Sequence, residues 1–185
     1  MNERPGVGSP HGTGEELRRA ELLPGQALEL VGERWTLLVV RDAFYGVRRY
    51  GDFLAHLDIP RAVLADRLAT LVEAGILQRH RYQSSPPRDE YLLTDRGTEL
   101  WSVILPLARW GERHFATGEP LRTFRHAACG TELDPASRCP ACGHVDVPPG
   151  DVEAHTGPGV PAQPRQDPIS VALRQRPHRL LQPLL

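Results

Sequence analysis

The chain has 185 residues, of which 40% are hydrophobic, and a formal net charge of −1 at pH 7. That length suits one domain with an appendage. The near-neutral balance argues against a protein that is basic all over, although phosphate binding needs only a basic face. Because no run of about 18 apolar residues is present, we expect no membrane-spanning helix. The start of the chain has acidic residues and lacks the apolar core of a secretory signal.

Both ends of the chain have the composition of disordered segments. Residues 1–14 are rich in glycine and proline, and residues 157–185 are rich in proline, arginine and glutamine. Segments of this kind bury too little apolar surface to offset the entropy lost on ordering. We therefore expect an ordered region over residues 15–155, between a disordered N-terminus and a disordered basic tail.

Three helices are predicted in the first part of the ordered region. Residues 15–23 and 26–31 have helical composition, and Gly32 ends the second of these segments. Residues 33–44 form the third segment, within which residues 36–40 could be a buried strand by propensity alone. Their apolar side chains can nevertheless share one face of a helix that ends at Gly46, so we predict a helix there.

The next two segments predict a pair of helices joined by a short turn. They span residues 49–57 and 60–73, with the turn at residues 58–59. Pro60 can occupy the first helical position, where its missing N–H does no harm, and Gly75 can close the helix. The second helix has an apolar stripe on one side. The opposite face carries Arg61, Ala62, Ala65, Asp66 and Ala69.

A β-hairpin is predicted over residues 76–83 and 89–94, with a polar, proline-rich loop between the strands. Helix, turn, exposed helix and basic hairpin follow one another in a winged helix-turn-helix, which sets one helix in the major groove of DNA. That helix needs small residues for close approach and long polar residues near its start. The predicted DNA contacts are Arg48, Arg49, Arg61, Ala62, Ala65, Arg67, Arg81 and Arg88. Each arginine taken singly could instead be solvated surface.

A long helix is predicted over residues 95–115, with Thr94 as its N-cap and Asp95 favourable in its first turn. Pro106 should kink this helix, because proline removes a backbone hydrogen bond from a helix interior. Trp101 extends the apolar face of the helix beyond what one small core needs.

All three cysteines fall within residues 124–150, in two matched motifs. Each motif holds two ligand-type residues separated by two others and followed by a glycine, so that a tight turn can aim both side chains at one ion. Two such turns supply the four ligands of tetrahedral zinc. The predicted ligands are His126, Cys129, Cys139 and Cys142. The zinc should be structural, since a catalytic zinc needs an open position; the alternatives are a degenerate motif without metal and His144 as a substitute ligand.

The whole pattern predicts a mainly α protein with a small β-hairpin, in the α+β class. It comprises a winged helix-turn-helix, a small zinc-ribbon-like extension at residues 124–150, and disordered ends. Clustered cysteines without a disulfide framework fit a reducing cytoplasm. The sequence has no phosphate-binding glycine loop, nucleophile elbow or HExxH motif, so it does not indicate an enzyme.

Six sequence blocks resemble the HxlR-type regulators, a branch of the MarR-like winged helices. They are residues 27–38 (ALELVGERWTLL), 49–53 (RYGDF), 63–68 (VLADRL), 75–77 (GIL), 88–94 (RDEYLLT) and 110–112 (WGE). The resemblance covers residues 22–119 and implies a homodimer built from the N-terminal helix and the long helix, which fits the surplus apolar surface. The implied interface residues are Leu28, Trp101, Ile104, Leu107 and Trp110.

The resemblance also implies a regulator that binds double-stranded DNA beside a neighbouring gene, and we expect a repressor on a palindromic operator. Many family members carry a cysteine just before the first helix, which senses electrophiles or oxidants. Here Leu22 or Leu23 stands at that position and excludes thiol sensing there, so any small-molecule effector uses another site. The alternative function is a protein-interaction module that uses the winged helix and the ribbon without sequence-specific DNA binding.

Overall fold

The computed structural model describes residues 22–185, and the chain divides into two units, residues 1–33 and residues 34–185. The disorder expected for residues 1–14 lies outside the described residues, as does most of the helix expected over residues 15–23. In the part of the chain that is described, no helix is both long enough and apolar enough to cross a membrane.

Helix α2 (Leu23–Val31) is the described element of the first unit. Pro24 lies in its first turn, where proline is tolerated, so the break expected there between two helices is not found. The helix ends at Gly32, whose N–H donates to the Leu28 carbonyl at 2.7 Å. None of the residues of α2 is buried.

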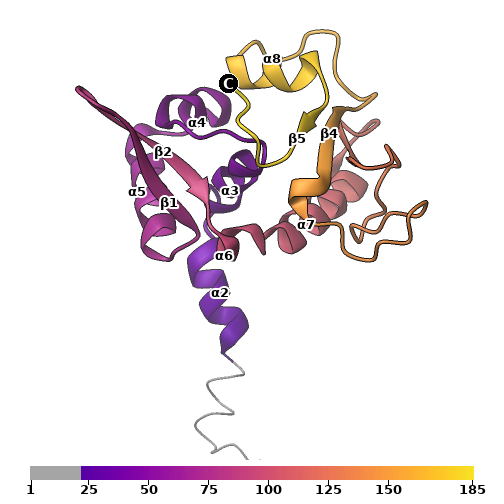
Figure 1. Ribbon diagram of the computed structural model, residues 1–185, viewed down its shortest axis with the longest axis horizontal. Coiled ribbons are helices and arrows are strands. Elements are labelled where there is room, and N and C mark those ends of the chain that lie inside the picture. The colour runs from indigo at the N-terminus through magenta and orange to yellow at the C-terminus, as the bar shows by residue number, and fades with distance from the viewer. Residues whose placement is uncertain (1–21) are drawn as a thin grey trace, which may run out of the picture. The chain divides into compact units, whose positions relative to one another are not determined.

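The second unit begins with a winged helix-turn-helix (Figure 1). Helices α3 (Thr36–Phe44), α4 (Tyr50–Leu57) and α5 (Arg61–Glu73) precede an antiparallel hairpin, the wing, made of β1 (Leu77–Ser84) and β2 (Pro87–Leu93). The third predicted helix is confirmed as α3, and the strand alternative is wrong. The wing strands reach further toward the tip than predicted, which leaves a loop of two residues between them.

The core of the winged helix lies between α3, α4 and α5. Val40 and Phe44 of α3 are one helical turn apart and fully buried. Helix α5 contributes Leu64, Leu68 and Leu71, which are spaced three and four residues apart and therefore share one face. Full burial of one such side chain stabilises the fold by about 1.5–3 kcal/mol. This spacing is what sequence analysis could detect, and it fixes which face of α5 remains exposed.

Two helices replace the single one predicted after the wing. Thr94 caps α6 (Asp95–Thr98) by accepting a hydrogen bond from the Gly97 N–H at 3.1 Å. In the turn that follows, the N–H groups of Leu100, Ser102 and Val103 each donate to the carbonyl three residues earlier, and α7 (Trp101–Phe115) begins within this turn. A Cβ at Gly97 would collide with the Ile76 carbonyl, so α6 is packed directly against the base of the wing.

A three-stranded antiparallel sheet follows α7 (Figure 1). Its strand order is β3 (Arg122–His126), β4 (Val152–Thr156) and β5 (His178–Arg179), and the single-turn helix η1 (Pro149–Asp151) leads into β4. Most of residues 124–150, the predicted ribbon-like extension, therefore forms a long connection between two paired strands.

The last part of the chain is folded, which corrects the disorder expected for residues 157–185. It forms α8 (Pro168–Gln175) and strand β5, and it buries Ile169, Leu173 and Leu180. Composition alone did not predict that this segment folds, because a few apolar residues at helical spacing are enough to form a buried face in an otherwise polar segment.

The end of this tail is hydrogen-bonded to the winged helix. The N–H of Leu181 donates to the Phe44 carbonyl at 2.8 Å, and the N–H of Leu184 donates to the Gly46 carbonyl at 3.2 Å. Gly46 has a left-handed conformation, with φ of 78°, and a Cβ there would collide with the Gln182 carbonyl, so this position requires glycine. The tail therefore completes the core of the second unit, with α8 beside α4 (Figure 1).

Candidate nucleic-acid interface and metal centre

Helix α5 presents a face of small residues to solvent. Ala62, Ala65 and Ala69 are exposed along this face, whereas the leucines on the opposite side are buried. Arg61 is exposed at the first position of the helix. The Tyr50 hydroxyl donates to the Arg61 carbonyl at 2.8 Å and so ties the start of α5 to α4. A helix with small side chains at its front can approach base edges closely.

The turn between α4 and α5 fixes the angle at which α5 is presented. Asp58 has a left-handed conformation, with φ of 52°, which aspartate tolerates better than most residues. Ile59 is buried and anchors the turn in the core. Pro60 is the residue just before the helix, one position earlier than predicted.

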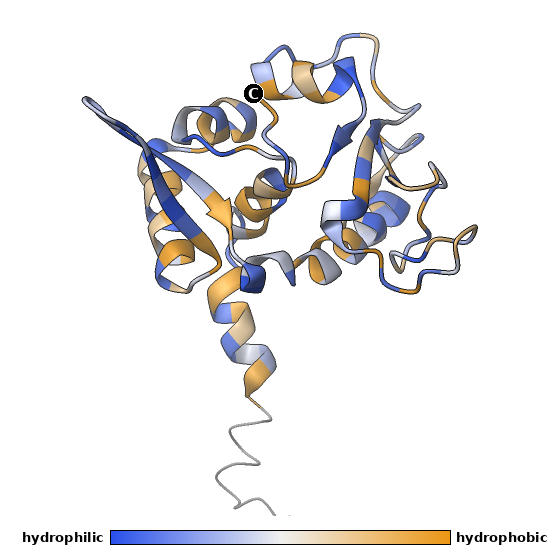
Figure 2. Cartoon of the chain, in the orientation of Figure 1, coloured by the Kyte–Doolittle hydropathy of each residue, from blue (hydrophilic) through white to orange (hydrophobic). Residues whose placement is uncertain are grey.

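The wing is polar along most of its length, and Figure 2 shows hydrophobic colour mainly where it joins the rest of the unit. Leu77 is buried at the base of β1, and the residues that follow it in this strand are exposed or half-buried. The wing therefore adds little to the core beyond its base. Its outer part can contact a polar or charged partner.

Acidic residues of β2 hold two of the arginines predicted to contact DNA. Arg81 pairs with Asp89 at 3.0 Å, and Arg49 pairs with Glu90 at 3.3 Å. The hydrogen bond from Arg81 lowers the pKa of Asp89. Arg49 also lies over the Tyr82 ring, 4.9 Å from its centroid. Exposed ion pairs contribute little to stability, so these arginines can exchange a carboxylate for a DNA phosphate at small energetic cost.

Arg61 and Arg88 are exposed, and within residues 22–185 neither forms an ion pair with an acidic side chain. Arg67 pairs with its neighbour Asp66 at 2.7 Å. The two unpaired guanidinium groups lie at the start of α5 and near the tip of the wing.

Arg48 is positioned differently from the other predicted DNA contacts. Its guanidinium donates to the Leu181 carbonyl at 3.0 Å, and the residue is half-buried. Arg48 therefore holds the tail, which corrects its assignment as an exposed DNA contact. The partner of Arg48 lies 133 positions away, in a segment whose composition predicts disorder, so the local pattern around Arg48 does not reveal the contact.

Two residues assigned to a dimer interface are buried within the chain itself. Trp101 and Ile104 are only 5% and 6% exposed. The Trp101 ring lies between Phe44 and Phe124, with ring centroids 5.2 Å and 5.4 Å away. Trp101 thus joins the winged helix to the second sheet, a neighbour that the sequence did not reveal, and its assignment to the interface is corrected.

The other three residues assigned to the interface are exposed. Leu28 on α2 is 64% exposed, and Leu107 and Trp110 on α7 are 49% and 47% exposed. Helix α7 also exposes Val103 and Phe115, which were not among the residues assigned to the interface. The spacing of Val103, Leu107 and Trp110 by four and three residues places them on one helical face. An apolar strip of this kind is suited to covering by another protein chain.

The predicted metal ligands lie on two turns with the same backbone geometry. The N–H of Gly130 donates to the His126 carbonyl at 2.8 Å, and the N–H of Gly143 donates to the Cys139 carbonyl at 2.9 Å. Both glycines are left-handed, with φ of 70° and 71°. In each turn the N–H of the first ligand also donates to the carbonyl after the glycine, at 2.9 Å. The two motifs recognised in the sequence are therefore matched in three dimensions.

The four predicted ligands, His126, Cys129, Cys139 and Cys142, meet in one place, with all their ligand atoms within 4.8 Å of one another. The Cys129 Sγ lies 3.5 Å from the Cys139 Sγ and 3.5 Å from the His126 Nδ1. Tetrahedral ligands about 2.3 Å from zinc stand about 3.8 Å apart, so the cluster has the dimensions of a zinc site. The His144 ring packs 5.2 Å from the His126 ring and is not one of the four clustered residues.

The crowding of three thiols also favours a cation. Hydrogen bonds with Thr131 lower the pKa of Cys129 to about 6, whereas hydrogen bonding with Cys129 raises the pKa of Cys142 to about 12. Ionisation of Cys129 is therefore favoured and that of Cys142 is opposed, and a bound zinc ion would stabilise the thiolate form of each ligand. These residues fit a zinc ion whose four positions are filled by protein, which is the structural rather than the catalytic type.

Comparisons with known proteins agree with this fold. Residues 30–119 match the family profile described as HxlR-like helix-turn-helix. An uncharacterized HTH-type transcriptional regulator of Mycobacterium tuberculosis, Rv3095, is 45% identical over 141 residues, which are 75% of this chain and 88% of the relative. A second, sll1512 of Synechocystis, is 38% identical over 85 residues, which are 45% of this chain and 63% of the relative.

Two of the similarities, one to a solved structure and one to the mycobacterial regulator, cover more of the chain than the winged helix alone. The crystal structure of PA1607, provisionally assigned as a transcription factor, is 29% identical, with a TM-score of 0.57 over 70% of this chain and 92% of that chain. The match to the mycobacterial regulator, at 75% of this chain, is longer than residues 1–119 and so continues beyond the winged helix.

Proposed function

We propose that this chain, which belongs to the HxlR-like helix-turn-helix family, binds a palindromic operator as a homodimer and represses a neighbouring gene. Family membership makes it a helix-turn-helix transcriptional regulator, as its relatives are named, and not an enzyme. The observation that supports the finer proposal is the exposed alanine face of α5, with Arg61 at its start and a polar wing on the same unit.

In the proposed complex, α5 lies in the major groove, where its alanines let the helix approach the base edges. Arg61 supplies a guanidinium to a base edge or a phosphate, and Arg88 at the wing tip reaches the adjacent minor groove. Arg49, Arg67 and Arg81 leave their carboxylate partners for backbone phosphates, which position the protein without reading sequence. Such a regulator meets its DNA in the cytoplasm.

The dimer is proposed on the exposed strip of α7, namely Val103, Leu107 and Trp110, together with Leu28 of α2. Each of these side chains has 45–64% of its surface open to water, and covering apolar surface contributes about 25 cal/mol per Å². A two-fold dimer would set its two α5 helices about 34 Å apart, the spacing of a palindromic site. Repression follows if that dimer covers DNA that the transcription machinery needs.

We further propose one structural zinc ion bound by His126, Cys129, Cys139 and Cys142. It would hold together the two turns between β3 and β4 and so stabilise the sheet against which Trp101 packs. Metal analysis of protein purified without chelator should give about one zinc per chain, whereas less than about 0.2 would contradict the proposal.

Fluorescence anisotropy with DNA from upstream of the chain's own gene tests the DNA proposal. Binding should resist scrambled competitor, and Arg61→Ala should weaken it about tenfold or more, because one base or phosphate contact is lost. The control is Arg125→Ala, which removes an exposed arginine from β3 and should leave the affinity unchanged. Equal competition by scrambled DNA, or equal effects of the two variants, would contradict sequence-specific reading by α5.

A further inference from the structure

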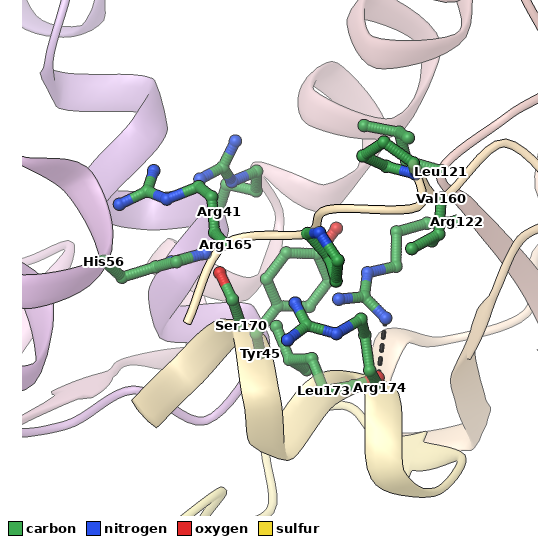
Figure 3. Close-up of a pocket in the computed structure, with 12 residues that line it drawn as sticks. Arg41, Tyr45, His56, Leu121, Arg122, Val160, Arg165, Ser170, Leu173 and Arg174 are labelled. Atoms are coloured by element: carbon green, nitrogen blue, oxygen red, sulfur yellow. Dashed lines mark hydrogen bonds between the residues drawn. The ribbon is translucent and has the colours of Figure 1, made fainter. Parts of the chain in front are cut away.

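A pocket of about 280 Å³ opens between the winged helix and the tail (Figure 3). Helices α3 and α4 provide one wall, and β3, residues 160–165 and α8 provide the other. Four arginines line the pocket: Arg41 from α3, Arg122 from β3, Arg165 from the segment before α8, and Arg174 from α8. No acidic residue of the described chain is among its lining residues.

Two of these four positive charges are already balanced. The Arg41 Nη2 is 2.7 Å from the Asp42 Oδ1, and the Arg165 Nε is 3.2 Å from the Asp167 Oδ2. Asp42 is fully buried and its other oxygen is 2.7 Å from the His56 Nδ1. Both Asp42 oxygens are therefore already in contact with a partner, one with Arg41 and the other with His56.

Arg122 and Arg174 carry the unbalanced charge, since neither forms an ion pair within residues 22–185. Arg122 donates to the Leu173 carbonyl at 2.6 Å, and Figure 3 shows its guanidinium beside that of Arg174. Burial lowers the pKa of Arg122, and the nearby charges of Arg174 and Arg41 lower it as well. An anion beside both guanidinium groups would relieve this crowding of like charges.

The remainder of the lining is mostly apolar. Tyr45, Leu121, Leu173, Val160 and Pro161 all line the pocket. A small inorganic anion would leave these surfaces in contact with water, whereas an organic anion of suitable size would cover them. The pocket has the combination typical of small-molecule sites, which is an apolar wall with a few convergent polar groups.

We propose that this pocket binds a small organic acid, with its carboxylate against Arg122 and Arg174 and its apolar body against Tyr45 and Leu173. Guanidinium groups suit this ligand because their fixed N–H donors make short, charge-assisted hydrogen bonds to a carboxylate. The family match covers residues 30–119 and so does not include the tail residues that form one wall of the pocket.

The location of the pocket means that a bound ligand would affect how the tail is held against the winged helix. The acid would touch residues of α3, α4 and the tail at once, and Arg165 already donates to the Ala55 carbonyl of α4 at 3.4 Å. It would therefore hold the tail against the first helix of the helix-turn-helix. An effect of the acid on DNA binding rests on the proposed function, whereas binding of the acid to the pocket does not.

Thermal unfolding of the full chain, read in the absence of DNA, tests the proposal. The probes are benzoate and octanoate, the uncharged matches are benzamide and octanamide, and sulfate is the inorganic anion, all at equal ionic strength. At least one acid should raise the melting temperature by mass action, while the amides and sulfate should not. Failure of both acids, or an equal rise with sulfate or with the matching amide, would overturn the proposal.

A pair of variants in the same segment locates the binding. Arg174→Gln should raise the apparent Kd of the acid at least about tenfold, because it removes one of two charge-assisted contacts. Arg176→Gln is the matched control, since this exposed arginine lies outside the pocket and its loss should leave Kd unchanged. Retained binding by Arg174→Gln would place the acid elsewhere. Arg61 lies outside the pocket, so Arg61→Ala should bind the acid with unchanged Kd even though it weakens DNA binding. The two proposals can therefore fail independently of each other.

Discussion

Replacing Trp101 tests how the winged helix is joined to the second sheet. Its ring is 5% exposed and lies between the rings of Phe44 and Phe124. Trp101→Ala would leave a cavity between these two rings, and large aromatic deletions of this kind cost about 3–5 kcal/mol of unfolding free energy. That is a large part of the total stability of a typical domain, which is about 5–15 kcal/mol.

Trp101→Phe should be much less damaging, for a reason specific to this site. The Trp101 indole N–H is buried and has no hydrogen-bond partner among the described residues. Leaving a buried donor unpaired costs about 1–3 kcal/mol, and phenylalanine removes that donor while keeping an aromatic ring between its neighbours. The gain offsets part of the lost packing, so we expect a net loss below about 2 kcal/mol.

Urea unfolding followed by circular dichroism measures both variants at one protein concentration and with zinc supplied. Trp110→Ala, on the exposed face of the same helix, is the matched control and should instead weaken self-association in sedimentation experiments. A loss below about 1 kcal/mol for Trp101→Ala, or equal losses for alanine and phenylalanine, would refute the packing described here. Unchanged self-association of Trp110→Ala would refute the proposed dimer surface.

Three further predictions concern the metal, the wing and pH. Cys139→Ser should release the zinc and lower the melting temperature, whereas His144→Ala should keep the metal, as measured by metal content; zinc retained by the cysteine variant would contradict the ligand set. Arg88→Ala should reduce the slope of log K against log salt for DNA binding by about 0.9, and an unchanged slope would mean that the Arg88 charge does not lie against the DNA. Burial lowers the pKa of His178, so the unfolded chain binds this proton more readily and stability should fall as pH drops below about 6.5. His178→Gln should flatten that fall in urea unfolding, and an unaltered pH profile would show that another group is responsible.

The winged helix could be predicted because its information is local. Leu64, Leu68 and Leu71 mark the buried face of α5 by spacing alone, and the face left over is the one with Arg61. The metal ligands were equally accessible, since each pair is held by one tight turn that is closed by a glycine. In both cases neighbours in sequence are also neighbours in space.

The contacts that sequence analysis missed are all non-local. Trp101 was assigned to a dimer interface because its neighbour Phe124 belongs to a sheet that the sequence pattern did not predict. Arg48 was read as a DNA contact because the tail that it holds has the average composition of a disordered segment. The arginines of the pocket come from four separate elements and share no motif, so only the folded chain brings them together.

The docking of the tail on α3 also has a consequence for the order of folding. The hydrogen bond between Arg48 and Leu181 joins residues 133 positions apart, and contacts of such long separation close a large loop and slow the approach to the native state. Helix α5 and the wing depend mainly on contacts close in sequence and should therefore form early, whereas α4 also packs against α8 of the tail. The surface that faces DNA would then be assembled well before the pocket behind it, which exists only after the last segment has docked.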